Sequence, residues 1–406
     1  MPSESSIGQA QALSLSASLA RFGHCSMEAF GANLRGLLFE QRMSAEEHRL
    51  VNNCLDAIRE AIAPLGPDWY AEAFGSVANG FAMSGSDVDI SCHCNGVAWQ
   101  ANQLALEDLR SRLQPLLAND PKFEVVEEIW SARIPVLRLK FDLALDVDLT
   151  CHNLNALCNT RLLRAYSDLS PVVHQVVIAV KVWAKSAGVH GARAGHLSSY
   201  SVTLMAIYFL QVECQVPCIP TNAFDSMGVI ACDDVPKAWA CSLTLPELVR
   251  GFFAFYVDVF RWGNEVVSVR SGERLPPAHR TYAGLAFAEF PSLHIEDPYE
   301  THKNLSRVLA TEQEYLLWAR LSEAHAAFCS GQFPTALRWR RRRQCKLVCT
   351  TCKARIPMCW KCLERCETCP QCDVDFFDFE SNSESDSTIC HCEFSSSAKQ
   401  NVRDDE

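Results

Sequence analysis

Residues 73–92 read AFGSVANGFAMSGSDVDISC, and this stretch decides how the rest of the chain is interpreted. Asp87 and Asp89 are separated by one apolar residue, so on a strand both side chains face the same way. Two neighbouring carboxylates in a partly dry site repel each other unless cations neutralise them. Mg²⁺ or Mn²⁺, which prefer oxygen ligands, would suit them. Upstream, Gly75 and Ser76 supply a tight turn, backbone N–H groups and a hydroxyl, all suited to holding a phosphate.

A third carboxylate would complete a two-metal site, and a second strand offers two candidates. The alternating run IPVLRLKF at 134–141 leads into LDVDL at 145–149, which predicts a neighbouring strand. Asp146 and Asp148 lie on one face of it, and either could join the first two acids. A lone Asp-x-Asp is usually a solvated strand end or turn. The Gly-Ser turn and the second acidic strand together favour the metal site.

These motifs resemble the polymerase-β-like nucleotidyltransferases, and within them the terminal uridylyltransferases and non-canonical poly(A) polymerases. The resemblance covers roughly residues 50–310. It implies attack of an RNA 3′-hydroxyl on the α-phosphate of a nucleoside triphosphate, with release of pyrophosphate and two metal ions at the reacting oxygens. Asp87 and Asp89 would hold both ions, and Asp148 would hold the one that activates the hydroxyl. Asp148 is preferred to Asp146 because the residues that follow it look like the family's stretch after its third acid.

The same resemblance implies contacts to the triphosphate. Lys181 and Lys185 are about one helical turn apart and would lie near it, although a solvated basic helix face is the alternative. The sequence LSSY at 197–200 matches a family motif in which Ser199 would touch the phosphates and Tyr200 would stack on the base. A helix N-cap followed by a core tyrosine is the alternative there.

Contacts to the sugar and the base follow from two further matches. Asn159 would bind the ribose 2′-hydroxyl, which selects ribonucleotides, and Thr160 would lie close to the nucleotide. The segments VVSVR and HIEDPYE resemble the family's poly(A)-polymerase-associated block. There the family usually shows Thr-His-Asn-Leu, with the His recognising uracil, whereas residues 301–305 read THKNL. Lys303 fills the His position, or a one-residue shift restores His302. A Lys ammonium only donates hydrogen bonds, so it could meet a uracil carbonyl but not an adenine amino group. This favours UTP and leaves ATP open.

The composition indicates a globular chain of more than one domain, because 48% of its 406 residues are hydrophobic and 21% are charged. We expect an α+β fold: a nucleotidyltransferase palm with a small mixed sheet and helices at 26–153, then a helical central domain at 154–330. The poly(A)-polymerase-associated segment would span about 245–305, and the first helix could pack on the helical domain. Residues 1–25 read as a flexible lead rather than a signal peptide. No apolar run reaches the ~20 residues that span a bilayer.

The C-terminal part separates opposite charges within a net charge of −11. Residues 337–366 hold ten Lys or Arg and one acid, and residues 367–406 hold eleven acids and two bases. The run Arg338–Arg343 would contact RNA backbone, act as a nuclear signal or form a solvated linker. The acidic tail at 373–406 is expected to be disordered.

Closely spaced cysteines in the basic segment at 338–372 predict structural zinc, and eight thiolates suit two ions of undetermined pairing. An iron–sulfur cluster is a lesser alternative. In the remaining alternative the cysteines are free thiols that bind no metal. These cysteines are Cys345, Cys349, Cys352, Cys359, Cys362, Cys366, Cys369 and Cys372. Thiols in this number fit a reducing compartment, and we expect the cytoplasm, or the nucleus if the Arg run is a signal.

The sequence thus predicts an enzyme that adds UMP from UTP to RNA 3′ ends without a template. A non-canonical poly(A) polymerase that uses ATP is the alternative. An inactive RNA-binding scaffold is a lesser one, because all three acids and Ser76 are present. A transferase for small acceptors is disfavoured by the LSSY and EDPY blocks.

Overall fold

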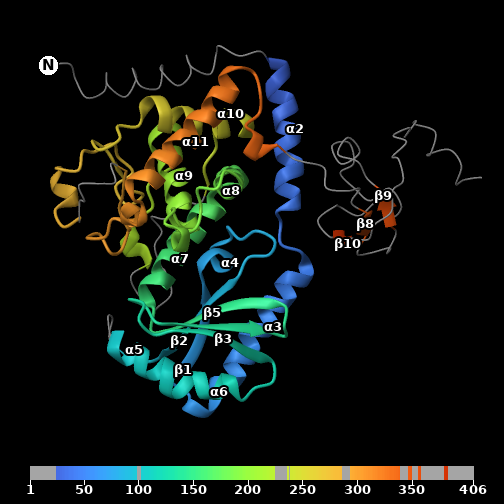
Figure 1. Ribbon diagram of the computed structural model, residues 1–406, viewed down its shortest axis with the longest axis vertical. Helices are drawn as coiled ribbons and strands as arrows, with labels where there is room; N and C mark the ends of the chain where they lie inside the picture. Colours follow the sequence, from blue (N-terminus) through green and yellow to red (C-terminus); the bar gives the residue numbers. More distant parts are fainter. Residues whose placement is uncertain are drawn as a thin grey trace, which may run out of the picture. The chain divides into compact units, whose positions relative to one another are not determined.

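A computed structural model describes residues 24–97, 102–224, 236, 238–285, 293–338, 346–349, 355–357 and 379–382. The chain forms two compact units, one of residues 1–43 and 47–338 and the other of residues 44–46 and 339–406. In the larger unit a mixed sheet with helices precedes a helical region, which confirms the predicted α+β class (Figure 1). Among the described residues, no helix has both the length and the apolar character needed to cross a membrane.

Five strands form the sheet of the larger unit. Its order is β1 (Trp69–Phe74), β2 (Val88–Cys94), β5 (Leu145–Cys151), β4 (Val136–Phe141) and β3 (Phe123–Ile129). β2 and β5 are parallel and the other neighbours are antiparallel. β4 and β5 form a hairpin because Asp142 and Leu143, with φ of 47° and 58°, turn the chain back.

One face of this sheet is apolar and packs against helices (Figure 1). These are α3 (Ala45–Ile62), α5 (Asn102–Asp108) and α6 (Gln114–Ala118), and a π-helical turn at Leu109–Leu113 lies between α5 and α6. Alternate residues of β2 and β5, such as Ile90 and Leu149, are fully buried in that core. The acids that alternate with them therefore point to the opposite face.

Helices pack on and beyond that opposite face. α4 (Gly75–Asn79) packs on α7 (Leu154–Leu169), and both contact the sheet. The helical region continues with α8 (Pro171–Ser186), α9 (Ser199–Cys214), α10 (Leu245–Ala254) with a π-helical turn at Phe255–Val259, and α11 (Thr311–Cys329). The first described helix, α2 (His24–Glu40), packs against α8 and α10.

Short elements complete the larger unit. β6 (Val266–Val267) and β7 (His294–Ile295) form a parallel pair. Short 3₁₀ helices lie at Ala63–Leu65, Ala192–Ala194, Thr221–Phe224, Arg280–Tyr282, Leu305–Val308 and Thr335–Leu337.

The described part of the smaller unit is a three-stranded sheet of order β10 (Phe379–Asn382), β8 (Lys346–Cys349) and β9 (Arg355–Pro357). β10 lies in the acidic tail, whose disorder stays a prediction, and it pairs antiparallel with β8. The side chains of the eight predicted zinc ligands lie outside the described part, as do residues 1–23 and most of the Arg run.

Phe252 lies at the centre of the helical region. Its ring is fully buried and contacts the rings of Trp183, Phe209 and Tyr256. Phe252→Ala should therefore lower the free energy of unfolding by about 3–5 kcal/mol, measured by denaturant titration. Tyr315 on α11 is 69% exposed, so Tyr315→Ala should change the free energy of unfolding by less than about 0.5 kcal/mol. Equal losses in the two variants would contradict this view of the core.

Candidate functional site

The Gly75-Ser76 turn brings the start of α4 against the acidic strand. Gly75 has φ of 69°, and a Cβ added there would overlap the Asp89 carboxylate. Only glycine therefore fits both the backbone conformation and the space. The Gly75 N–H donates to Thr160 Oγ on α7 at 3.0 Å.

Three carboxylates gather on the face of the sheet that points away from the core formed with α3, α5 and α6. The parallel register of β2 and β5 pairs Asp89 with Asp148, and Asp87 directly precedes β2. Burial raises the pKa of Asp89 to about 8, with further contributions from the charges of Asp87 and Asp148. Burial also raises the pKa of Asp148, although Arg138 opposes this through a 3.0 Å contact between its Nε and Asp148 Oδ1. Asp146 is exposed and pairs with Lys140 at 3.0 Å, outside this group.

Such a set of oxygens fits divalent cations. The raised pKa of Asp89 means that its negative charge is not fully compensated by the protein. Hard cations such as Mg²⁺ and Mn²⁺ bind carboxylate oxygens and would supply the missing positive charge. Asp87, Asp89 and the second oxygen of Asp148 are therefore the residues that could hold them.

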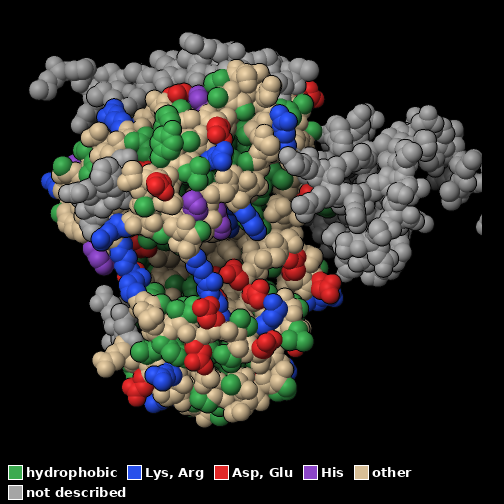
Figure 2. All heavy atoms as spheres, in the orientation of Figure 1, with side chains coloured by type: hydrophobic (Ala, Val, Ile, Leu, Met, Phe, Trp, Pro, Cys, Tyr) green, Lys and Arg blue, Asp and Glu red, His purple; other side chains and the backbone are tan. Residues whose placement is uncertain are grey.

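A cavity of about 600 Å³ opens beside these acids. Figure 2 shows the surface hollowed between the sheet-bearing and the helical halves of the larger unit, with Lys and Arg side chains on the rim. Asp87 and Asp89 line the cavity, but Asp148 does not contribute to its wall. All nine residues predicted to bind the nucleotide line it: Gly75, Ser76, Asn159, Thr160, Lys181, Lys185, Ser199, Tyr200 and Lys303.

The two lysines of α8 differ in their surroundings. Lys181 is 3% exposed, and its Nζ donates to the Phe81 carbonyl at 2.5 Å. Burial lowers the pKa of Lys181 to about 8, against the opposing effect of Asp87. Lys185 is exposed and lies in the last turn of the helix, so burial by the surrounding apolar residues, which would argue against a solvated basic face, holds for Lys181 alone. It still lines the cavity.

Tyr200 joins the two walls of the cavity. Its hydroxyl donates to Asn159 Oδ1 at 2.6 Å and lies 3.3 Å from Asp297 Oδ2. Burial raises the pKa of Tyr200 well above its usual value, and the negative charge of Asp297 makes a smaller contribution in the same direction. The N-cap interpretation holds for Ser198, which accepts the Ser201 N–H at 3.1 Å. Ser199 instead faces the cavity and contacts His190 Nε2 at 2.7 Å.

A short loop carries Lys303 to the cavity. Lys303 forms an ion pair with Glu300, which also pairs with Arg133 at 3.1 Å. Asp297 Oδ1 accepts the N–H groups of Tyr299 and Glu300 and so shapes the loop. His302 lines a different cavity, so Lys303 rather than His302 faces the site.

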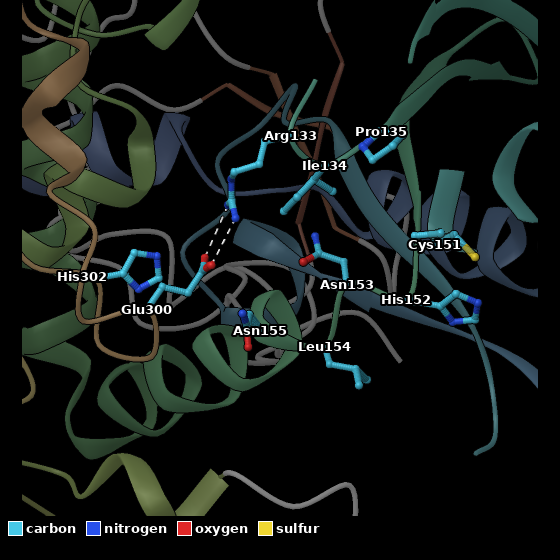
Figure 3. Close-up of a pocket in the computed structure, with 11 residues that line it drawn as sticks. Arg133, Ile134, Pro135, Cys151, His152, Asn153, Leu154, Asn155, Glu300 and His302 are labelled. Carbon is cyan, nitrogen blue, oxygen red and sulfur yellow. Dashed lines mark hydrogen bonds and ion pairs between the residues drawn. The ribbon is translucent and has the colours of Figure 1, made fainter. Parts of the chain in front are cut away.

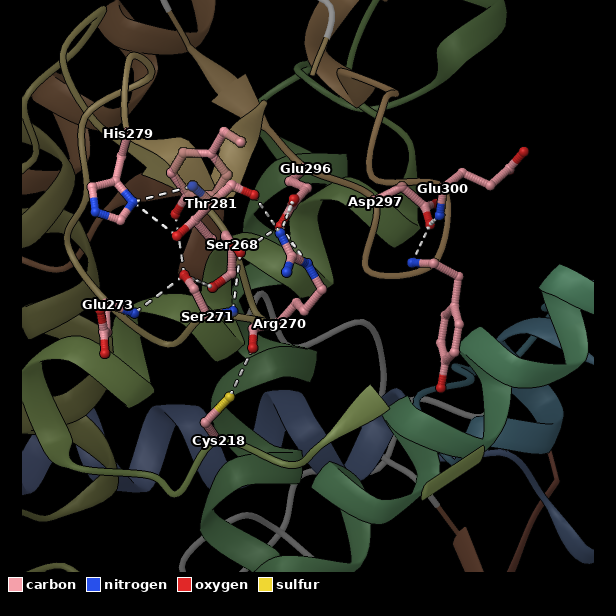
Figure 4. Close-up of polar contacts among 12 residues, drawn as sticks. Cys218, Ser268, Arg270, Ser271, Glu273, His279, Thr281, Glu296, Asp297 and Glu300 are labelled. Atoms are coloured by element: carbon pink, nitrogen blue, oxygen red, sulfur yellow. Dashed lines mark hydrogen bonds and ion pairs between the residues drawn. The ribbon is translucent and has the colours of Figure 1, made fainter. Parts of the chain in front are cut away.

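A partly buried ion pair anchors this loop (Figure 4). Glu296, which precedes Asp297, is 1% exposed and accepts hydrogen bonds from Ser268 Oγ at 2.6 Å and Arg270 Nη2 at 2.5 Å. Arg270 also donates to the Thr281 carbonyl at 3.1 Å. The VVSVR and EDPY segments therefore hold each other, because the Arg of one neutralises the Glu of the other.

Sequence reasoning missed four residues of this region. His190 contacts Ser199, Arg138 contacts Asp148, and Asp297 and Glu300 shape the loop. The HIEDPYE block contains two of these residues, but its resemblance to the family block assigns no roles to its acids. The alternation of β4 could have placed Arg138 opposite Asp148, because their strands pair in that register. No local pattern marks His190.

Family models match two parts of the chain. Residues 30–168 match the model described as "Poly(A) RNA polymerase, mitochondrial-like, central palm domain". Residues 244–303 match "Cid1 family poly A polymerase". The first match contains the acidic strands, and the second contains the loop with Lys303.

Characterised relatives include both kinds of enzyme. Terminal uridylyltransferase cid1 of Schizosaccharomyces pombe is 27% identical over 323 residues, which cover 73% of this chain and 78% of that protein. Poly(A) RNA polymerase gld-2 of Caenorhabditis elegans is 30% identical over 258 residues, 59% of this chain and 22% of that protein. The chain thus spans about a fifth of gld-2.

Solved structures show the same fold. A cytoplasmic RNA terminal U-transferase superposes with a TM-score of 0.62 and 26% identity, over 76% of this chain and 97% of that one. Cid1 in complex with its short product ApU superposes with a TM-score of 0.63 and 25% identity, over 76% and 96% of the two chains. This chain therefore carries a palm domain and a Cid1-type poly(A)-polymerase-associated segment, is similar to terminal uridylyltransferases and poly(A) polymerases, and is a nucleotidyltransferase.

Proposed function

We propose that this enzyme adds UMP from UTP to RNA 3′ ends without a template. The observation that carries the proposal is the cavity lined by Asp87, Asp89 and all nine predicted nucleotide-binding residues. Relatives with named RNA substrates support it, since Cid1 has been solved with the product ApU and with a UTP analogue. A non-canonical poly(A) polymerase that uses ATP is the second candidate, because gld-2 is a relative of that kind.

The proposed roles follow from position and charge. Asp87, Asp89 and Asp148 would hold two Mg²⁺ or Mn²⁺ ions, which lower the pKa of the attacking hydroxyl and offset charge on the leaving group. A Cid1 structure with Mg and 3′-dATP supports this metal. Lys181 and Lys185 would neutralise phosphate oxygens, and the Gly75-Ser76 turn would cradle them.

The remaining residues would orient the nucleoside. Asn159 accepts a hydrogen bond from Tyr200, which leaves its amide N–H₂ free to donate to a ribose hydroxyl. The ring of Tyr200 would stack on the base. Arg138 would hold Asp148 in place through the 3.0 Å contact.

The preference for UTP rests on Lys303. Its ammonium is tied to Glu300, and it can donate a hydrogen bond to a uracil carbonyl but cannot accept one from an adenine amino group. We further propose zinc at the cysteines of residues 345–372 and a cytoplasmic location.

The simplest experiment offers the purified protein a short labelled RNA with Mg²⁺ or Mn²⁺ and one nucleoside triphosphate at a time. Extension with UTP alone or preferentially supports uridylylation, and extension with ATP supports the second candidate. No extension with any nucleotide would favour an inactive RNA-binding scaffold.

The first prediction concerns the acids. Asp87→Asn, Asp89→Asn and Asp148→Asn should each lower kcat by roughly 10³-fold or more, because each removes a charge that the cations need. Asp146→Asn is the matched control, since Asp146 lies on the same strand as Asp148 but is exposed and pairs with Lys140. Primer extension measures the rates. A large loss in Asp146→Asn with a normal rate in Asp148→Asn would reverse the assignment.

The second prediction concerns the turn. Gly75→Ala should lower the extension rate by at least about 100-fold, because its Cβ would displace the Asp89 carboxylate. Gly96→Ala is the control: Gly96 also has a positive φ, of 81°, but a Cβ there meets nothing within 4 Å. Similar rates in the two variants would show that backbone strain, not the contact with Asp89, matters.

The third prediction concerns the base. Lys303→Gln introduces an amide oxygen that can accept from an adenine amino group, so the ratio of kcat/KM for UTP to that for ATP should fall about tenfold or more. Lys303→Arg, which still only donates, should keep the wild-type preference. An unchanged ratio in Lys303→Gln would remove Lys303 from the specificity argument.

A further inference from the structure

Three metal-ligating side chains of different chemistry meet at the end of β5. Cys151 ends this strand, His152 follows it, and Asp108 is the last residue of α5. Their ligand atoms all lie within 4.8 Å of one another, and His152 Nε2 is 2.9 Å from Asp108 Oδ2. Cys151 is 2% exposed and the side chains of His152 and Asp108 are 3% and 4% exposed, so water does not surround this cluster.

The backbone holds these side chains in place. His152 adopts φ of 53° while its N–H donates to the Cys92 carbonyl on β2 at 2.9 Å. Asp108 stands directly before the π-helical turn, a local irregularity that is common at functional sites. One oxygen of Asp108 forms an ion pair with Arg112 Nε at 3.1 Å, and the other faces His152.

An entry route reaches the cluster. Cys151 and His152 line a cavity of about 280 Å³, and Figure 3 shows them together at one end of it, away from the Arg133–Glu300 ion pair. A buried metal site needs such an access path.

We propose that Asp108, Cys151 and His152 bind a zinc ion. A thiolate, an imidazole and a carboxylate are the three ligand types that Zn²⁺ takes in proteins, at about 2.0–2.3 Å, whereas sulfur and nitrogen disfavour Mg²⁺. Zinc binding displaces the thiol proton of Cys151 to solvent. Arg112 stays on the second oxygen of Asp108 and orients the carboxylate.

The fourth position is open to one more ligand. Cys94 lies on β2, two residues beyond Cys92 and on the same face, and Cys92 pairs with Cys151 across the two strands. Cys94 is only half-buried, and either its thiol or a water molecule from the cavity completes a tetrahedral site.

Such an ion would tie α5 to the junction between β5 and α7. This junction lies between Asp148 on the strand and Asn159 on the helix. The ion would therefore fix the relative position of the acidic strand and the helix that carries the proposed ribose contact. It is separate from the cations at the three acids and from the cysteines of residues 345–372.

The rival explanation needs no metal. The Asp108–His152 contact would then be a buried hydrogen bond, with Cys151 as a core thiol beside it. The two explanations differ in how many zinc ions the chain holds.

The test measures zinc per chain by atomic emission, after loading the full-length protein with zinc and dialysing away the excess. Wild type should retain one more equivalent than Cys151→Ser and His152→Gln. Cys54→Ser is the matched control, because Cys54 is a fully buried thiol of the same core outside the cluster, and it should equal wild type. The cysteines of residues 345–372 contribute equally to every variant. Equal zinc content in all four proteins would overturn the proposal.

A conservative variant separates lost ligation from lost folding. His152→Cys supplies another zinc ligand at the same position, so it should retain the ion that His152→Gln loses. Loss of the ion in both, together with a lowered melting temperature in both, would mean that His152 acts on folding alone and would overturn the proposal. With Co²⁺ in place of zinc, the thiolate charge-transfer band should be weaker in Cys151→Ser than in Cys54→Ser. Cys94→Ser assigns the fourth ligand: loss of the ion identifies the thiol, and retention identifies water.

Discussion

The parallel pairing of β2 and β5 places Asp89 beside Asp148, and the rest of the larger unit depends on this arrangement. Two carboxylates on adjacent strands, with a third just before one of them, repel one another in a partly buried setting. The pKa of Asp89, raised to about 8, expresses that cost. A fold tolerates such a cost at a site where a bound cation removes it, which is why perturbed acids of this kind mark functional sites.

Several neighbouring elements are shaped around these acids. The apolar residues that alternate with them bury one face of the sheet against α3, α5 and α6, so a one-residue slip would turn the acids into the core. Gly75 allows α4 to begin directly against Asp89, and its N–H meets Thr160 of α7. The same short segment thus links the acidic strand to the helix that carries Asn159.

The helical half contributes the loop that carries Lys303 and anchors it through a second segment. Arg270 neutralises the buried Glu296, and the next residue, Asp297, shapes the turn that leads to Lys303. Tyr200 connects this loop to α7 through Asn159 and Asp297. Sugar and base recognition would therefore be coupled, because one hydroxyl group lies between their proposed contacts. The chain departs from the usual family pattern at Lys303, where its proposed base preference is decided.

Local patterns and family motifs in the sequence determined the fold class, the two acidic strands, and nine residues that line the cavity beside the acids. They did so because alternation, helical spacing and glycine turns are local properties, and the family motifs are contiguous. Tertiary structure alone decided the rest. The family motif favours Asp148 over Asp146, but only the pairing of strands shows that Asp148 lies beside Asp89 while Asp146 is exposed, although both lie on one face of the same strand. Burial separates Lys181 from Lys185, and contacts between different elements bring Arg138, His190 and Asp108 to their partners. Such contacts depend on how the elements pack in space, which their local patterns do not encode.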